Sequence, residues 1–86
     1  MIQIKAVSYD DENNVDGGIN FYWDKGNSQV LYQEWEFKAS GPVWGPVNPD
    51  PMFSELKSND PKASFIDYVK QCWGHYAIVD VEDNYC

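Results

Sequence analysis

Three stretches in the first 39 residues alternate apolar with polar side chains, and this pattern constrains the chain more than any other feature. Side chains two apart on a strand point to the same face, so each stretch predicts a half-buried strand. The three predicted strands are residues 1–9, 19–24 and 28–39. A turn-rich segment, 10–18, closed by Gly17-Gly18, joins the first two. We therefore expect an antiparallel meander at the start of the chain.

The hairpin between the second and third strands has two possible registers. A two-residue Gly26-Asn27 loop would place Phe21 opposite Tyr32, whereas a three-residue loop over 25–27 would place Phe21 opposite Leu31. The second register brings more apolar side chains onto one face, so we predict the three-residue loop. Three tryptophans on apolar faces are predicted to be core: Trp23, Trp35 and Trp73.

Residues 40–58 hold four of the five prolines and break the alternation. We predict a proline-rich loop here, with one helical turn over Met52–Lys57, because Asp50-Pro51 pairs an N-cap residue with proline at the first helical position. Trp44 stands between two Gly-Pro steps of this loop. It either packs as a lid over the sheet edge or serves as an exposed anchor for a partner, since tryptophan is enriched among interface hot spots.

One later segment has a helical pattern, which begins at Asp60-Pro61 and ends at Gly74. Its apolar residues recur at the spacing of one helix face: Phe65, Ile66, Val69, Cys72 and Trp73. Residues 76–81 alternate again and predict a last strand. The β-β-β-α-β order predicts one α+β domain over residues 1–86, a two-layer arrangement of an antiparallel three- to four-stranded sheet with one main helix on one face.

The charge of the chain is −8, from fourteen acidic residues and six lysines without any arginine. Half of the acidic residues gather in two short segments: Asp10, Asp11, Glu12 and Asp16, and Asp80, Glu82 and Asp83. Such a charge opposes direct binding of nucleic acid and fits a basic protein surface. The alternative is that both segments are solvated and only keep the protein soluble.

The path of the last strand decides whether the two acidic segments meet. If the helix runs back along the sheet from the end where the proline segment starts, the last strand is parallel to the first and brings Asp80–Asp83 beside Asp10–Asp16. If the proline segment crosses the sheet, the last strand is antiparallel and separates them. Short connections that do not cross the sheet are favoured, so we predict the parallel path and one acidic edge.

Patterns for catalysis or metal binding are absent from the sequence. As a calcium loop, a segment begun at Asp10 has Val15 where glycine belongs and Phe21 where glutamate belongs. The sequence offers one pair of possible zinc ligands, Cys72 and His75, and one separate cysteine, Cys86, so no zinc site is expected. Cys72 is predicted to be a buried thiol. Glu34 and Glu36, two apart on a strand, read as its solvated face. We expect neither a metal, nor a cofactor, nor enzymatic activity.

In size, acidity and lack of arginine, the chain is similar to small standalone inhibitors such as phage anti-CRISPR and anti-restriction proteins and immunity proteins to nuclease toxins. This resemblance implies a cytoplasmic inhibitor that covers the basic surface of a nucleic-acid-handling protein. The candidate binding residues are the seven clustered carboxylates and Trp44. The alternatives are an immunity protein or a non-catalytic adaptor. No apolar run approaches a membrane span and the first residues lack a signal-peptide pattern, so we expect no membrane partner.

Overall fold

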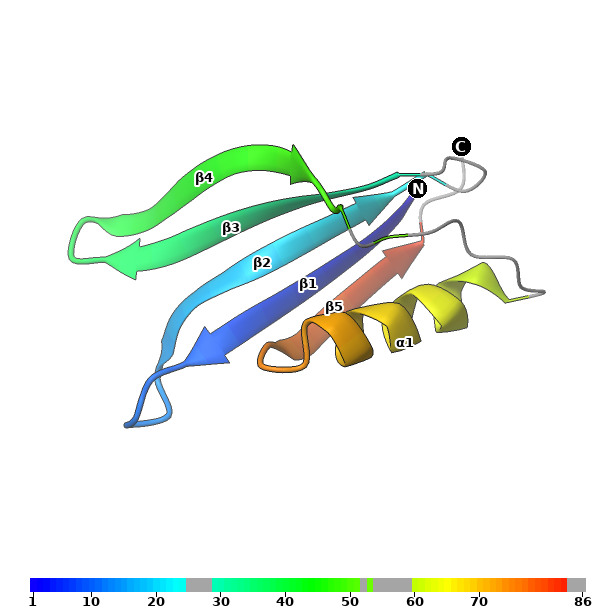
Figure 1. The fold of residues 1–86 in the computed structure, drawn as a ribbon. Helices are drawn as coiled ribbons and strands as arrows, with labels where there is room; N and C mark the ends of the chain where they lie inside the picture. Colours follow the sequence, from blue (N-terminus) through cyan, green and yellow to red (C-terminus); the bar gives the residue numbers. More distant parts are fainter. Residues whose placement is uncertain (25–28, 52, 54–59, 84–86) are drawn as a thin grey trace.

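The computed structural model describes residues 1–24, 29–51, 53 and 60–83. Its elements in chain order are β1 (Ile2–Tyr9), β2 (Val15–Trp23), β3 (Val30–Lys38), β4 (Gly41–Pro49), α1 (Pro61–Cys72) and β5 (Ala77–Asp83). The strands form one antiparallel sheet in the order β4-β3-β2-β1-β5, and α1 lies along one face of it (Figure 1). The predicted α+β class with one main helix is confirmed for the described residues, but the sheet has five strands instead of three or four.

The additional strand is β4, which occupies the first half of the segment predicted to be a proline-rich loop. It pairs with β3 from Lys38↔Gly41 to Leu31↔Pro49. Proline cannot donate to a β ladder and is therefore confined to edge strands, and β4 is an edge strand. A strand of this kind does not show the usual alternation, so the loop prediction is wrong for residues 41–49. The helical turn predicted over Met52–Lys57 lies outside the described residues.

Because β4 carries the chain back along the sheet, it also sets the direction of everything that follows. The helix then starts at the other end of the sheet, and β5 runs antiparallel to β1, with Val7 opposite Ala77 and Ile2 opposite Asp83. The predicted parallel last strand is therefore wrong.

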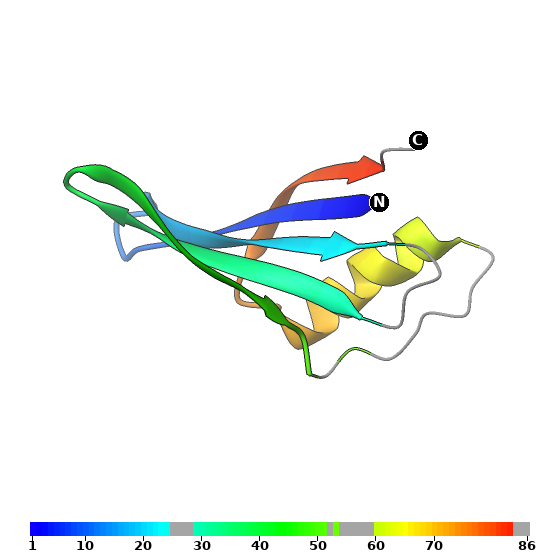
Figure 2. The same cartoon turned by 90° about the horizontal axis from the view of Figure 1, so that it is seen from above.

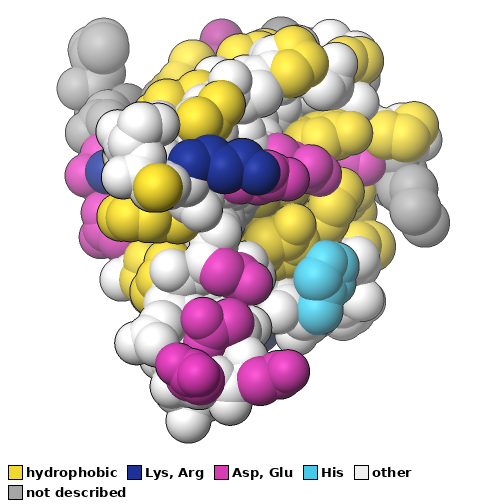
Figure 3. All heavy atoms as spheres, turned by 90° about the vertical axis from the view of Figure 1, so that its left-hand side faces the viewer, with side chains coloured by type: hydrophobic (Ala, Val, Ile, Leu, Met, Phe, Trp, Pro, Cys, Tyr) yellow, Lys and Arg dark blue, Asp and Glu magenta, His cyan; other side chains and the backbone are white. Residues whose placement is uncertain are grey.

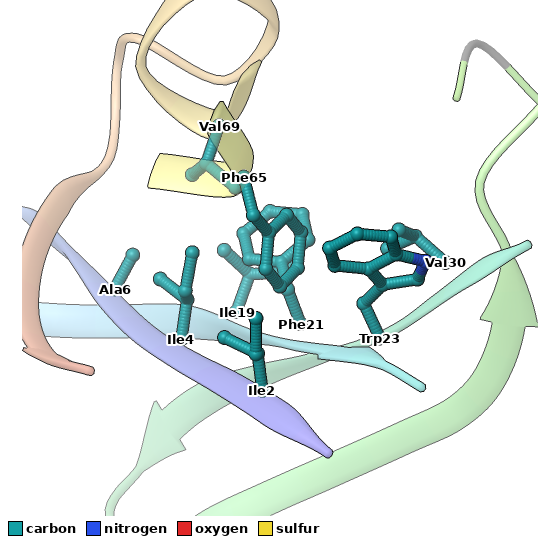
Figure 4. Close-up of a cluster of buried hydrophobic side chains, with 9 residues drawn as sticks. All are labelled: Ile2, Ile4, Ala6, Ile19, Phe21, Trp23, Val30, Phe65 and Val69. Atoms are coloured by element: carbon teal, nitrogen blue, oxygen red, sulfur yellow. The ribbon is translucent and has the colours of Figure 1, made fainter. Parts of the chain in front are cut away.

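The core lies between α1 and the face of the sheet that we call the inner face. Figure 4 shows its buried side chains, which come from β1, β2, the start of β3 and the helix: Ile2, Ile4, Ala6, Ile19, Phe21, Trp23, Val30, Phe65 and Val69. Phe21 is opposite Tyr32, so the predicted β2–β3 register is wrong. The observed register places Phe21, Trp23, Val30 and Tyr32 together under the helix. It places Trp35 on the opposite, outer face.

The helix begins where its sequence predicts and ends at Cys72, with Trp73 as the C-cap residue just before Gly74. The Asp60 side chain accepts a hydrogen bond from the Ala63 amide at 3.1 Å, and Pro61 takes the first helical position. Cys72 is exposed, contrary to expectation. The next residue, Trp73, packs instead against Phe21 and Tyr32, with ring centroids 5.5 and 5.2 Å away. Within the described part of the chain, α1 is too short and too polar to cross a membrane.

A buried carboxylate connects the end of β4 to the helix. Asp50 is 5% exposed, and its Oδ2 accepts hydrogen bonds from Tyr68 Oη at 2.7 Å and from Trp73 Nε1 at 3.2 Å. Its backbone amide donates to the Val30 carbonyl. Burial and the Asp50 carboxylate together raise the pKa of Tyr68 above its ordinary value. Asp50 thus holds β3, β4 and the helix together.

Candidate functional site: the open end of the sheet

The helix is shorter than the strands it covers, and this difference leaves part of the inner face uncovered. The 12 residues of α1 span about 18 Å, whereas a nine-residue strand spans about 30 Å. The sheet extends beyond α1 at the end that holds the β1–β2 and β3–β4 turns (Figure 2). We call this region the open end.

A hollow of about 520 Å³ lies at the open end. Three carboxylates line it, Glu34 and Glu36 from β3 and Asp16 from β2, together with the Tyr76 ring, which precedes β5. Glu34 is paired with Ile19, and Glu36 with Gly17, so both side chains lie on the inner face. From their two-residue spacing, Glu34 and Glu36 are predicted to form a solvated strand face. The fold instead places both carboxylates in one hollow.

The negative charge of the hollow affects the pKa of the Tyr76 phenol. Partial burial, followed by the negative charges of Glu34 and Asp16, raises the pKa of this phenol. Asp16 is held in place by the Ser8 hydroxyl, which donates to Asp16 Oδ1 at 2.7 Å. Lys38 offsets part of the charge, because its Nζ lies 2.9 Å from Glu36 Oε2, and this contact raises the pKa of Lys38.

The β1–β2 turn adds more carboxylates next to the hollow. Asp10 builds this turn: its Oδ1 accepts hydrogen bonds from the amides of Glu12 and Asn14, both at 2.9 Å. Asn13 takes the left-handed conformation (φ 63°), which asparagine tolerates better than most residues. Asp11 and Glu12 are thereby presented to solvent on an ordered turn. Figure 3 looks directly at the open end and shows acidic side chains gathered around and below a hollow with hydrophobic side chains.

The structure separates the two acidic segments predicted to meet. Asp10, Asp11, Glu12 and Asp16 lie at the open end. By contrast, Asp80, Glu82 and Asp83 follow β5 away from it, and Asp83 is opposite Ile2 at the start of β1. Glu82 approaches Lys5 at 4.0 Å. The single acidic edge predicted from the sequence is therefore wrong, because the direction of β5 is reversed.

Trp44 belongs to β4 and not to a lid loop. It is paired with Trp35 on the outer face, with ring centroids 5.9 Å apart, and 51% of it is exposed. Trp44 is also among the residues that line the hollow, although its pairing with Trp35 places its ring on the other side of the sheet from the carboxylates.

Among the residues that line the hollow, sequence reasoning missed the two glutamates and the tyrosine that carry the argument: Glu34, Glu36 and Tyr76. The two-residue spacing of the glutamates indicated that they share a face, but it gave no sign that the helix would stop short of them. Among the described residues, no group of three or more His, Cys, Asp or Glu side chains is arranged to hold a metal ion. Comparison of the chain with protein-family models, with curated proteins and with solved structures found no match in any of the three.

Proposed function

We propose that the protein is a small non-catalytic inhibitor whose open end binds the basic surface of a nucleic-acid-handling protein. The observation that supports this most is the grouping of carboxylates from separate elements around one hollow, described above. Glu34, Glu36 and Asp16 line the hollow, and Asp11 and Glu12 extend the negative surface along the adjacent turn.

The framework that carries these charges is ordered, and this favours binding. Glu34 and Glu36 project from a strand within the sheet, and the turn is closed by the Asp10 hydrogen bonds. A preorganised set of charges loses little conformational entropy when a partner docks. Surfaces of opposite charge also accelerate the encounter and select partners by the sign of their charge.

The hollow offers a place for a basic side chain of the partner. A lysine or arginine that enters it meets the Glu34 and Asp16 carboxylates and the half-buried Tyr76 ring. Carboxylates pair with guanidinium groups, and aromatic faces attract cations. In this proposal the carboxylates occupy partner side chains that otherwise contact nucleic-acid phosphates, so the protein inhibits by covering the surface.

Two variants with the same loss of charge test the proposal. The open-end variant is Asp11→Asn/Glu34→Gln/Glu36→Gln, and the control variant is Asp67→Asn/Asp80→Asn/Glu82→Gln. Each immobilised protein is incubated with lysate, and the retained proteins are identified by mass spectrometry and assayed for nucleic-acid binding. We expect the wild type and the control to retain the same nucleic-acid-binding protein and to block its activity. The open-end variant should retain at least about tenfold less. Equal retention by both variants would contradict the proposal.

A further inference from the structure

The outer face of the sheet, which α1 does not cover, carries a continuous group of apolar side chains. On β3 and β4, Trp35 pairs with Trp44, and Phe37 pairs with Pro42. The ring centroids of Trp35 and Phe37 are 6.3 Å apart. Phe37 is 57% exposed and Trp44 is 51% exposed. Large apolar patches are rare on the surface of monomeric proteins and usually mark an interaction site.

The shape of this face combines a ridge with a groove. The Trp35 indole lies over Gly18, where a Cβ atom would come within 2.5 Å of Trp35 Nε1, so only glycine leaves room for the ring. Trp35, Phe37 and Trp44 form a ridge that is also one wall of a groove of about 420 Å³. Val7 and Asn20 contribute to its lining, as does Val79 from β5, which is 57% exposed.

The charge of the outer face is unlike that of the rest of the protein. The glutamates of β3 lie on the inner face, and Asp16 of β2 is bonded to Ser8 beside the hollow. The strand pairing places two carboxylates on the outer face, and both belong to the edge strand β5: Asp80 opposite Lys5 and Glu82 opposite Gln3. Lys5, which lines the groove, adds a positive charge there. A basic partner therefore finds little to bind on the ridge and groove, whereas an apolar surface fits them.

We propose that the outer face docks against the same face of a second copy, so that the protein forms a two-fold symmetric dimer with the two sheets packed face to face. Five strands of seven to nine residues make a face of about 600 Å² in projection. Stable protein interfaces bury about 600–1,000 Å² of accessible surface on each partner. The uneven outer face therefore offers an area of the size that a stable dimer needs.

A second copy suits this face because a two-fold interface must complement itself. The ridge and the groove lie side by side on the same surface, so rotation of a second copy sets the ridge of each subunit into the groove of the other. Sheets packed in this way are about 10 Å apart, and their strands cross at about 30°.

Both edges of the sheet are poorly suited to association, which leaves the face as the surface for a dimer. On β4 the prolines at 42, 46 and 49 remove backbone donors. On β5, pairing with another β5 would bring carboxylates of the two copies together: Asp80, Glu82 and Asp83. The face-to-face dimer also leaves the inner face free, so this inference does not rest on the proposed function.

Sedimentation velocity of the full chain over a range of concentrations tests the dimer. We expect the wild type to dimerise with a dissociation constant below about 100 µM, and Phe37→Lys to weaken the dimer at least tenfold. The matched pair Val79→Lys and Val43→Lys changes the same residue type by the same charge. These valines are similarly exposed, at 57% and 51%, but Val43 pairs with Glu36 on the inner face. Of these two valine variants, only Val79→Lys should weaken the dimer.

The wild type alone decides the main point, whether or not each variant folds. A wild type that stays monomeric up to about 1 mM would overturn the proposal, as would dimerisation that Val43→Lys weakens as much as Phe37→Lys. Circular dichroism of each variant serves as the folding control. Acrylamide quenching of tryptophan fluorescence adds a reading without substitution, because dimerisation should shield Trp35 and Trp44 as the concentration rises.

Discussion

The covered part of the inner face and its open end belong to the same sheet, but they are built from different side chains. Under the helix, Trp23 is 2% exposed and its ring contacts those of Phe53 and Phe65, with centroids 5.7 and 5.6 Å away. At the open end, the equivalent face of β3 carries Glu34 and Glu36. The difference shows that the length of the helix decides where packing constrains the sheet, and that strand positions beyond the helix are available for charged groups.

The largest expected effect compares two tryptophans inside and outside the covered part. Trp23→Ala removes a buried aromatic side chain and should lower the free energy of unfolding by roughly 3–5 kcal/mol. Trp44→Ala removes a half-exposed ring and should cost less than about 1 kcal/mol in dilute solution. Urea unfolding followed by circular dichroism measures both. Equal losses would mean that Trp44 is part of the core.

A smaller effect compares two hydrogen-bonded carboxylates. Asp50→Ala leaves the Tyr68 hydroxyl and the Trp73 indole N–H without this acceptor, and should cost about 1–3 kcal/mol. Asp16→Ala removes one exposed acceptor of Ser8 and should change stability by no more than about 0.5 kcal/mol. The same urea titration applies. A larger loss for Asp16→Ala would show that the open end also stabilises the fold.

The smallest effect concerns pH. Burial and neighbouring carboxylates raise the pKa values of Tyr68 and Tyr76, whose ordinary value is 10.0, so the folded state favours the neutral phenols. Their contribution is therefore complete below about pH 10 and is lost as the pH rises further. In thermal melts between about pH 8 and pH 11, Tyr68→Phe should flatten this decline more than Tyr76→Phe. The assignment would be contradicted if the melting temperature increased as the pH was raised beyond about 10.

The elements that depend on local sequence could be predicted, and those that depend on their neighbours could not. Asp60-Pro61 defines the start of the helix because N-capping involves only residues adjacent in the sequence. The β2–β3 register depends on which face the helix covers, and the apolar Trp35 favoured the wrong one. The direction of β5 depends on β4, whose prolines break the alternating pattern by which a strand is predicted. The missed strand and the reversed last strand are thus one error.

The candidate site divides in the same way. The acidic turn at Asp10–Asp16 could be predicted from the sequence, because its charged residues lie close together along the chain. Glu34 and Glu36 join it only through the fold, since β3 ends at the same end of the sheet as β1. Asp80–Asp83 do not lie on the predicted acidic surface, because their position depends on the direction of the whole strand β5.

The association rate between the protein and the partner that it retains tests the central claim, that the open end binds and the other acidic segment does not. At about 0.05 M salt, Asp11→Asn/Glu34→Gln/Glu36→Gln should lower this rate at least tenfold and flatten its dependence on salt. Asp67→Asn/Asp80→Asn/Glu82→Gln should keep the rate within about threefold of the wild type, since its charges lie away from the contact. If the two variants slow association equally, net charge alone drives binding and the open end has no special role.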